Sequence, residues 1–350
     1  MFYAPGPHVW AIDSTNRVPT GFHHVNNVYA DTAYYFVTVG AAAGRRVPTA
    51  ATPAGSPSST ITTFTDRRFY EHDLTNILRS GRRWLGERFA SGTAQDFNFS
   101  SDGQPALTDL VPGSPVRLRV AVAASSLGSS YFQASLNGAP LPGILPVAEI
   151  LTLPFTAVAN TYTGNLTTTL ASAAEPRVTL SYTSTAANAT TAGYLDYLEL
   201  LVQRQLRLSA ASLEFRSLDA LRGAGTVGQY TLSNATGAQV WEVTNPRRPR
   251  AQALAGGSFV AYTDSVREYV AFQPSGSFPT PRLFSKVANQ NLHALNLGGD
   301  LDLVIVTYPA FRRQAERLAQ HRRDYNGMKV EVVTTKQVFN EYASGAQDVT

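Results

Sequence analysis

The hydrophobic pattern changes period twice between residues 298 and 335. Residues 301–306, LDLVIV, form an almost unbroken apolar run, which is typical of a strand covered on both faces in a parallel sheet. From Ala310 onward, apolar residues recur at helical spacing while arginines fill the opposite face. The apolar positions of this predicted helix are Phe311, Ala315, Leu318, Ala319 and Tyr325.

A second strand and a second helix follow. Gly327 suits the left-handed position just past a helix end, because it has no side chain to clash there. Residues 328–333 predict a strand, and Thr334 with Gln337 predicts a capping box before a helix that begins near Lys336. The order strand, helix, strand, helix predicts that residues 289–350 open an α/β domain.

Residues 106–208 show a different pattern, the alternation of half-buried strands. Val116, Leu118, Val120 and Val122 face one way, while Arg117, Arg119 and Ala121 face the other. Further strands are predicted at 131–136, 163–170, 178–183 and 193–202, and Asn137-Gly138 favours a tight hairpin turn. The last run places Leu195, Tyr197, Glu199 and Leu201 on one face. An antiparallel β-sandwich of jelly-roll type satisfies this pattern.

The flanking regions are also predicted to be β-rich. In residues 1–105 we expect one or two strands within 27–39, an exposed loop over 44–60, and a short helix capped by Asp73 that ends at Ser80-Gly81. Residues 209–288 form a second β-rich module, followed by the α/β region. Its predicted strands are 213–215, 228–233, 239–243, 257–261 and 268–272, with a linker at 274–281. The predicted fold class is multidomain and mainly β, ending in the first β-α-β-α of an α/β domain.

Composition supports a folded, weakly charged protein, with 43% hydrophobic and 15% charged residues and a formal net charge of +4. Arginine dominates the basic residues, because Lys286, Lys329 and Lys336 are the only lysines. We interpret this as a compositional bias; a preference for an anionic surface is the alternative. The sequence has no cysteine, which excludes disulfides, thiolate metal sites and a thiol nucleophile within these residues.

Targeting patterns are absent from the sequence. Residues 1–20 lack a basic segment followed by an apolar core, and no apolar run approaches the ~18 residues of a membrane-spanning helix. A cytosolic protein and an internal fragment of an exported protein both fit this absence. The opening MFYAPGPHVW, already rich in strand and turn residues, favours the fragment.

Two histidine positions are candidate metal or catalytic residues. The adjacent His23 and His24 would point to opposite faces of a strand, and no carboxylate lies at a ligand-like spacing. His72 lies between Glu71 and Asp73, but neighbours in sequence do not converge on one point. We therefore assign surface or packing roles to all three histidines and predict neither a metal nor a cofactor.

Other chemical motifs are equally weak. No GxSxG motif is present, and Gly298-Gly299 precedes its strand, whereas a dinucleotide-binding turn follows one. The arginines of 247–250 and of the helix after Ala310 lack interleaved aromatics, so nucleic-acid binding is not predicted.

The predicted strand 301–306 has two ends with different chemistry. Asp300 and Asp302 could help hold a cation at its start, although Asp302 more simply marks the strand entry. The functional end of a parallel strand is its carboxyl end, near Thr307 and Tyr308.

Residues 301–350 resemble the opening of the gingipain-type (C25) cysteine peptidase domain, in the version found in sortases of the type IX secretion system. The resemblance lies in the strand, Pro-x-Phe, the AERLA helix, the NGMKV turn and strand, and the tail FNEYASGAQDVT. Residues 23–38 and 63–89 also resemble the amino-terminal part of that family.

The resemblance implies a cell-surface, outer-membrane-associated enzyme that removes carboxyl-terminal sorting domains from secreted cargo. Implied partners are this cargo, other type IX components and an anionic lipopolysaccharide. In the family, the catalytic His and Cys lie downstream of the matched region, so we expect no catalytic residue in this chain and no activity of the chain alone. Two buried parallel strands also need further strands and helices, and GAQDVT, with Asp348 or Thr350 as a cap, would begin the next helix.

The alternative is a non-catalytic surface protein whose sandwich binds a glycan or a protein partner. Tyr131, Phe132, Tyr162, Tyr194 and Tyr197 are the aromatic residues that could form a sugar platform, although core packing explains them better. A cytosolic α/β enzyme is a third option, and no motif supports it.

Overall fold

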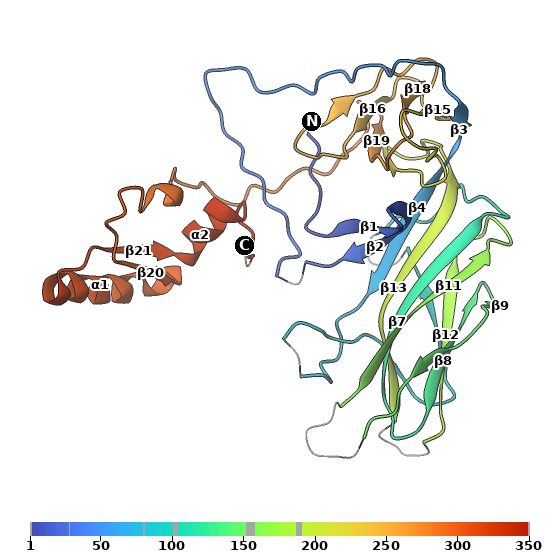
Figure 1. Ribbon diagram of the computed structural model, residues 1–350, viewed down its shortest axis with the longest axis horizontal. Coiled ribbons are helices and arrows are strands. Elements are labelled where there is room, and N and C mark those ends of the chain that lie inside the picture. Colours follow the sequence, from blue (N-terminus) through green and yellow to red (C-terminus); the bar gives the residue numbers. More distant parts are fainter. Residues whose placement is uncertain are drawn as a thin grey trace. The chain divides into compact units, whose positions relative to one another are not determined.

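The computed structural model describes residues 2–27, 29–79, 81–100, 104–151, 158–186 and 191–348. The chain divides into two compact units. One contains residues 1–9, 25–46 and 278–350, and the other contains residues 10–24 and 47–277. The larger unit is built of strands, and the described helices of the chain lie in the smaller one (Figure 1).

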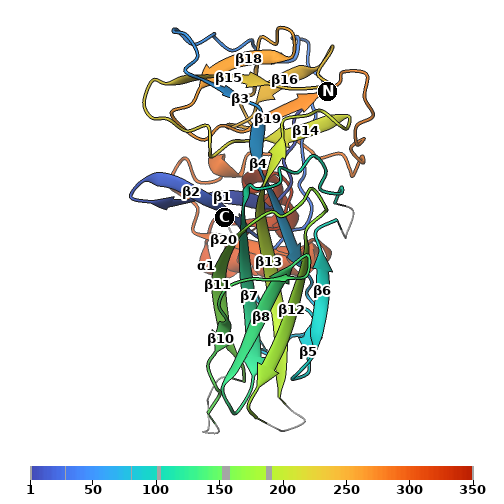
Figure 2. The ribbon, with the colours of Figure 1, turned by 90° about the vertical axis from the view of Figure 1, so that its right-hand side faces the viewer.

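A two-layer antiparallel β-sandwich forms much of the larger unit (Figure 2). One sheet contains β6 (Ala94–Asn98), β8 (Ser130–Leu136), β9 (Ala139–Pro140), β10 (Leu145–Val147) and β12 (Arg177–Ser184). The other contains β4 (Thr63–Glu71), β5 (Arg88–Phe89), β7 (Pro115–Ser125), β11 (Asn160–Thr169) and β13 (Ala192–Gln205). The strand orders are β10-β8-β12-β6 and β11-β7-β13-β4, with β9 paired to β8 and β5 to β13. The predicted sandwich is therefore confirmed.

The sandwich core follows the alternation of the sequence. Val116, Leu118, Val120 and Val122 on β7 are each at most 2% exposed and belong to one hydrophobic cluster. Burying each such side chain contributes roughly 1.5–3 kcal/mol. The turn between β8 and β9 uses Asn137 and Gly138 at φ 49° and 82°, as the Asn-Gly pair predicts.

Strand β13 departs from the predicted alternation. Its pairing with β7 shifts register between Leu195 and Tyr197, which marks a β-bulge at Asp196. Leu195 therefore faces the core, whereas Tyr197, Glu199 and Leu201 lie on the opposite face from Leu198 and Leu200. The prediction that Leu195 shares a face with the other three residues is wrong, because the extra residue reverses the alternation.

Two smaller sheets complete the β-rich part of this unit. One has the order β14-β19-β16-β17, and the other has the order β18-β15-β3, with β3 parallel to β15. Their bounds are β3 (Ser59–Ile61), β14 (Ser212–Phe215), β15 (Val227–Thr231), β16 (Gln239–Glu242), β17 (Arg250–Ala251), β18 (Ser258–Tyr262) and β19 (Tyr269–Phe272). All five strands predicted within 209–288 are present. Phe215 and Tyr269 stack at 5.1 Å in their shared core.

Strand pairing crosses the predicted boundary at residue 105. β4, β5 and β6 come from residues 1–105 and pair with strands of the 106–208 sandwich. β3 comes from the same region and pairs with β15. The division between the two units falls after Ser277, inside the predicted linker 274–281.

The amino-terminal strands lie earlier than predicted. β1 (Val9–Thr15) and β2 (Val18–Val25) form a hairpin whose turn residues, Asn16 and Arg17, have φ of 51° and 65°. The strands predicted within 27–39 are wrong for the described residues 29–39, which are irregular. Val28 lies outside the described residues. High β-propensity does not form a strand where no partner strand supplies hydrogen bonds.

The helix predicted after Asp73 is also wrong. The described residues on either side of position 80 instead pair with each other, with the Leu85 carbonyl accepting the N–H groups of Leu74 and Thr75 at 3.0 and 2.7 Å. These bonds bring Leu85 into a buried cluster, which a helix would not do. The predicted end at Ser80 lies outside the described residues. The loop predicted over 44–60 is irregular and mostly exposed as far as residue 58.

The smaller unit contains the predicted strand-helix-strand-helix order. β20 (Leu303–Thr307) is parallel to β21 (Val330–Thr334), with a 3-10 turn η2 (Pro309–Phe311) and α1 (Arg312–Asn326) between them, and α2 (Thr335–Tyr342) follows. A second 3-10 turn, η1 (Leu292–Ala294), precedes β20. Gly327 ends α1 at φ 64° and donates its N–H to Arg323 at 3.1 Å, as predicted.

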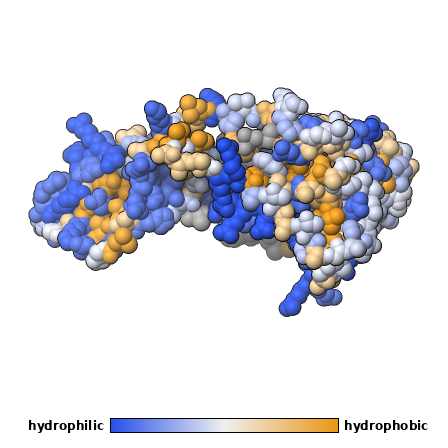
Figure 3. Space-filling view, turned by 90° about the horizontal axis from the view of Figure 1, so that it is seen from above, coloured by the Kyte–Doolittle hydropathy of each residue, from blue (hydrophilic) through white to orange (hydrophobic). Residues whose placement is uncertain are grey.

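One face of the β20–β21 sheet is covered by α1. Ala315 and Ala319 pack against Leu303, Ile305, Val330 and Val332. The prediction that β20 is covered on both faces is wrong for the described residues, because Val304 and Val306 are 43% and 56% exposed. Hydrophobic residues also appear at the surface of this unit among hydrophilic ones (Figure 3). Phe311, Leu318 and Tyr325 of the predicted apolar helix face are exposed.

Candidate functional site

The carboxyl ends of β20 and β21 form the edge at which parallel sheets bind ligands. Thr307 and Thr334 are partners in the register, and Tyr308 next to them is 63% exposed. Thr334 is occupied by the predicted capping box: its Oγ1 accepts the Gln337 N–H at 3.2 Å, and its own N–H donates to Gln337 Oε1 at 2.9 Å. These groups shape an edge of the sheet.

The opposite end of β20 is an ion-paired corner. Lys329 Nζ donates to Asp300 Oδ2 at 2.6 Å, and the Lys329 backbone N–H donates to Asp302 Oδ2 at 2.8 Å. Gly299, at φ 70°, donates its N–H to Asn296 in a turn that precedes the strand. The Lys329 ammonium group therefore pairs with Asp300, while Asp302 is held by a backbone N–H.

A connection to α2, which the sequence did not indicate, is made by Glu341. Its carboxylate accepts the Leu292 N–H at 3.0 Å, Gln290 Nε2 at 3.1 Å and His293 Nδ1 at 2.8 Å. The hydrogen bond from His293 is the main cause that lowers the pKa of Glu341, followed by the one from Gln290. Next to it lies an open cavity of about 530 Å³, lined mainly by leucines together with His293, Asp302 and Tyr342.

His23 and His24 contribute to the attachment of the β1–β2 hairpin to the sandwich. His23 Nδ1 lies 2.6 Å from Asp13 Oδ1 across the hairpin. His24 stacks on Phe69 of β4 at 3.7 Å, and its edge contacts Trp10. The two rings have different partners, so the predicted packing roles agree with the geometry.

Glu199 is the buried acceptor beneath this hairpin, and the bulge at Asp196 places it there. It accepts the His24 N–H at 2.8 Å and Arg119 Nη1 at 3.0 Å, and Arg119 in turn reaches Asp13 at 2.7 Å. Burial raises the pKa of Glu199, although the hydrogen bond from His24 and the charge of Arg119 oppose this rise. Asp196 itself is buried and pairs with Arg83.

His72 has a partner that its neighbours in sequence did not reveal. Its Nδ1 lies 2.8 Å from Glu87 Oε1, and the Tyr70 hydroxyl donates to the same oxygen at 2.6 Å. Glu71 instead lies in the β4 ladder opposite Tyr197. This group joins β4 to the segment before β5.

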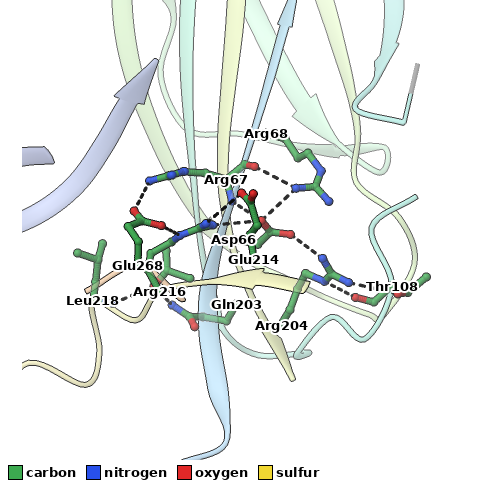
Figure 4. A network of polar contacts seen from close by, with 11 residues as sticks. Asp66, Arg67, Arg68, Thr108, Gln203, Arg204, Glu214, Arg216, Leu218 and Glu268 are labelled. Atoms are coloured by element: carbon green, nitrogen blue, oxygen red, sulfur yellow. Dashed lines mark hydrogen bonds and ion pairs between the residues drawn. The ribbon is translucent and has the colours of Figure 1, made fainter. Parts of the chain in front are cut away.

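A cluster of buried charged residues joins the sandwich to the smaller sheets (Figure 4). Asp66 on β4, 3% exposed, accepts Arg204 Nη1 at 2.7 Å and Arg68 Nη1 at 3.0 Å. Glu268, next to β19, accepts Arg216 Nε at 2.8 Å and Arg67 Nη1 at 2.9 Å. Sequence reasoning missed this cluster; the run Asp66-Arg67-Arg68 inside a strand was the available indication.

Burial and mutual charge shift the pKa values in this cluster. Burial, and then the charge of Arg216, lower the pKa of Arg67 to about 10. Burial acts to raise the pKa of Glu268, but Arg216 and Arg67 together hold it below its ordinary value. Arg216 is 3% exposed, and burial disfavours its charge, yet Glu268 and Asp66 raise its pKa. The cluster is a structural joint held by charge complementarity.

The remaining candidates are dispersed. Arg247 and Arg248 lie exposed in a turn organised by Asn245, and Arg250 is on the short β17. Among the aromatic residues, Phe132 is 0% and Tyr194 is 6% exposed, so neither can contact a sugar. Tyr162 is exposed, and Tyr197 packs 5.7 Å from Phe69.

The described residues contain no group of three or more His, Cys, Asp or Glu side chains arranged for a metal ion. No helix in the described ranges is both long enough and apolar enough to cross a membrane. The candidate site is the edge of the parallel sheet at which β20 and β21 end.

Comparison with known proteins identifies this unit. Residues 296–350 match the model of peptidase family C25, which confirms the resemblance found in the same residues. The fold of the chain as a whole is that of dimeric latent PorU from Porphyromonas gingivalis, whose crystal structure superposes with a TM-score of 0.80 at 23% sequence identity. The match covers 99% of this chain and 32% of the PorU chain, so the chain spans about a third of the length of that relative.

Two other solved structures resemble smaller parts. One is the catalytic unit of the GH87 α-1,3-glucanase from Streptomyces thermodiastaticus strain HF3-3, with 19% identity over 42% of this chain and 25% of that chain and a TM-score of 0.21. The other is a Paenibacillus xanthan lyase, with 14% identity over 52% of this chain and 25% of that chain and a TM-score of 0.17. Similarities at these scores carry no structural conclusion. No curated protein sequence matches the chain.

Proposed function

We propose that the chain is the amino-terminal part of a type IX sortase-like cysteine endopeptidase, which processes the carboxyl-terminal sorting domains of secreted cargo. One observation carries the proposal: the residues that match peptidase family C25 coincide with the parallel β20-α1-β21-α2 unit. The PorU-like fold of the whole chain supports it.

In such an enzyme a cysteine thiolate attacks the scissile carbonyl, and a histidine transfers the proton to the leaving amine. The sequence has no cysteine, so the thiolate has to come from outside these 350 residues. This chain would supply the β platform and the sheet edge at Thr307 and Thr334, on which the catalytic loops are built. Cargo with sorting domains, other type IX components and an anionic lipopolysaccharide are the proposed partners, at the outer surface of the cell.

The test is deletion of the gene in the bacterium that encodes it, followed by mass spectrometry of the carboxyl termini of secreted proteins. We expect cargo to keep its sorting domain, and trimming to return on complementation with the intact gene or with one carrying the surface substitution Asp96→Ala. Cargo trimmed at the same positions in the deletion strain would contradict the proposal.

The isolated 350-residue chain should be inactive, because it has no thiol nucleophile. The purified chain would be incubated with a cargo protein that carries its sorting domain, and cleavage followed by mass spectrometry. Turnover that is retained through repurification would refute the assignment of the thiolate to residues outside this chain.

A further inference from the structure

One connection between the two units is unusual in its composition and surroundings. The chain passes from the smaller unit to the larger at Arg46–Val47, after the stretch GAAAGRR of residues 40–46. Residues 36–46 are exposed and irregular, and Val37 and Val39 are 83% and 99% exposed. Residues 36–47 make no hydrogen bond or ion pair within the part of the chain that the structure describes.

This environment suits an endopeptidase substrate. Endopeptidases bind their substrates as an extended strand, so the backbone groups around the scissile bond have to be free. Exposed loops rich in small residues are the segments in which proteins are cut most readily. Arg45 and Arg46 add two adjacent, exposed arginines at the point where this stretch meets the larger unit.

Arg17 and the pair Arg247-Arg248 are exposed basic residues held in turns, whereas Arg282 is a single arginine in a second exposed, irregular segment. Arg17 lies in the tight turn between β1 and β2. Arg247 and Arg248 donate their backbone N–H groups to Asn245 at 3.0 and 2.9 Å, and a proline follows them. Arg282, on the connection after Ser277, is two residues from Phe284, whose ring packs on Tyr34 at 5.3 Å.

We propose that Arg45-Arg46 is a processing site for an arginine-specific endopeptidase, and that residues 1–46 remain bound as a separate chain after the cut. Water adds to the Arg46 carbonyl carbon, the bond to the Val47 nitrogen breaks, and the products are an Arg46 carboxylate and a Val47 amine. The proposal does not depend on the function proposed above.

Contacts on both sides of the cut explain why the fragments stay together. Within the larger unit, Phe22 of the hairpin is 2% exposed, and Asp13 pairs with Arg119 at 2.7 Å. In the smaller unit, Tyr34 packs on Phe284. Beyond the cut, Ala251 donates its N–H to Pro48 at 2.9 Å and accepts that of Ala50 at 2.7 Å. Opening this short bridge is the local step needed before the residues after Arg46 can enter a protease.

The test is limited proteolysis of the 350-residue chain with trypsin, with products identified by intact mass. The first cut should fall after Arg45 or Arg46, and the variant Arg45→Gln/Arg46→Gln should lose it. The matched control, Arg247→Gln/Arg248→Gln, removes an equally exposed pair and should leave it unchanged. The proposal would be overturned if the first cut fell elsewhere, for example after Arg282. It would also be overturned if the Arg45→Gln/Arg46→Gln variant gave the same cleavage pattern as the parent chain.

The second half of the proposal has its own measurement. After the cut, residues 1–46 and 47–350 should elute together from a size-exclusion column in native buffer and separate in denaturant. Elution as two species in native buffer would overturn retention of the amino-terminal segment, whichever bond is cut first.

Discussion

Removing the Asp66 carboxylate should destabilise the larger unit strongly. Its side chain is 5% exposed, and it pairs with Arg204 and Arg68, whose side chains are 9% and 13% exposed. Asp66→Ala leaves these cations buried without their carboxylate, and breaking a buried pair in this way costs about 3–5 kcal/mol. Arg204 keeps a hydrogen bond to the Thr108 carbonyl at 2.6 Å, which favours the lower value, about 3 kcal/mol.

Thermal and urea unfolding followed by circular dichroism measure this cost. A loss of about 3 kcal/mol should lower Tm by roughly 6–12 °C for a unit of this size. Asp96→Ala is the matched control, because Asp96 pairs with Arg177 at 3.5 Å between side chains that are 48% and 55% exposed. Exposed pairs contribute about 0–1 kcal/mol.

A double variant separates the charge effect from lost packing. In an Arg204→Met background one of the two orphaned cations is gone and Arg68 remains, so Asp66→Ala should cost at least about 1 kcal/mol less than in the parent chain. Two results would refute the conclusion that charge complementarity stabilises this cluster. One is an Asp66→Ala variant that is as stable as Asp96→Ala. The other is the same loss of unfolding free energy for Asp66→Ala in the parent chain and in the Arg204→Met variant.

Three further predictions concern acid sensitivity, a helix end and a crowded glycine. The folded-state pKa of Glu268 is below its ordinary value of 4.5, so the ionised carboxylate stabilises the fold above pH 4.5, and this stabilisation is lost as the pH falls through the folded-state pKa. The free energy of unfolding should therefore fall less on acidification in Glu268→Gln than in the parent chain. Equal slopes of unfolding free energy against pH in the two proteins would contradict this prediction. Gly327→Ala should destabilise α1 by about 1–2 kcal/mol, because residue 327 has a φ of 64°. Circular dichroism measures the loss of helix, and Ala343→Gly, at a position just after α2, is the control that should change little. Gly193→Ala should cost about 1–3 kcal/mol, since its new carbon would lie 2.5 Å from Phe132 and 2.7 Å from Tyr182; an unchanged urea midpoint would show that the core relaxes freely.

The parts of the fold that the sequence predicted are those fixed by local patterns. The alternation on β7, the turn at Asn137-Gly138 and the end of α1 at Gly327 each depend on residues within a few positions of one another. The capping box of Thr334 and Gln337 is likewise local. Such features need no knowledge of the rest of the chain.

The parts that were missed depend on distant contacts. Asp66 and Arg204 are 138 residues apart, and Arg67 and Glu268 are 201 apart, so no window of sequence contains their interaction. The bulge at Asp196 is decided by pairing with β7, which also determines that Glu199 faces the hairpin. Residues 29–39 have the composition of a strand but have no partner strand in the described fold.

The same distinction applies to the candidate site. The β-α-β-α unit and its C25 resemblance were evident from residues 301–350, because strand, helix and turn patterns follow each other directly there. The connection of Glu341 to Gln290 and His293 was not, since it joins segments about fifty residues apart that no motif links.

The proposed function requires that the β20–β21 sheet, which α1 covers on one face, has a second covering layer on the other. Hydrogen–deuterium exchange of the 350-residue chain tests this most directly, because protection reports local stability. We predict that the amides of β20 and β21, next to the exposed Val304 and Val306, exchange much faster than those of β7 and β13 in the sandwich. Equal protection of the two sheets in the monomeric chain would show that the β20–β21 unit is stable as it stands, and would contradict the claim.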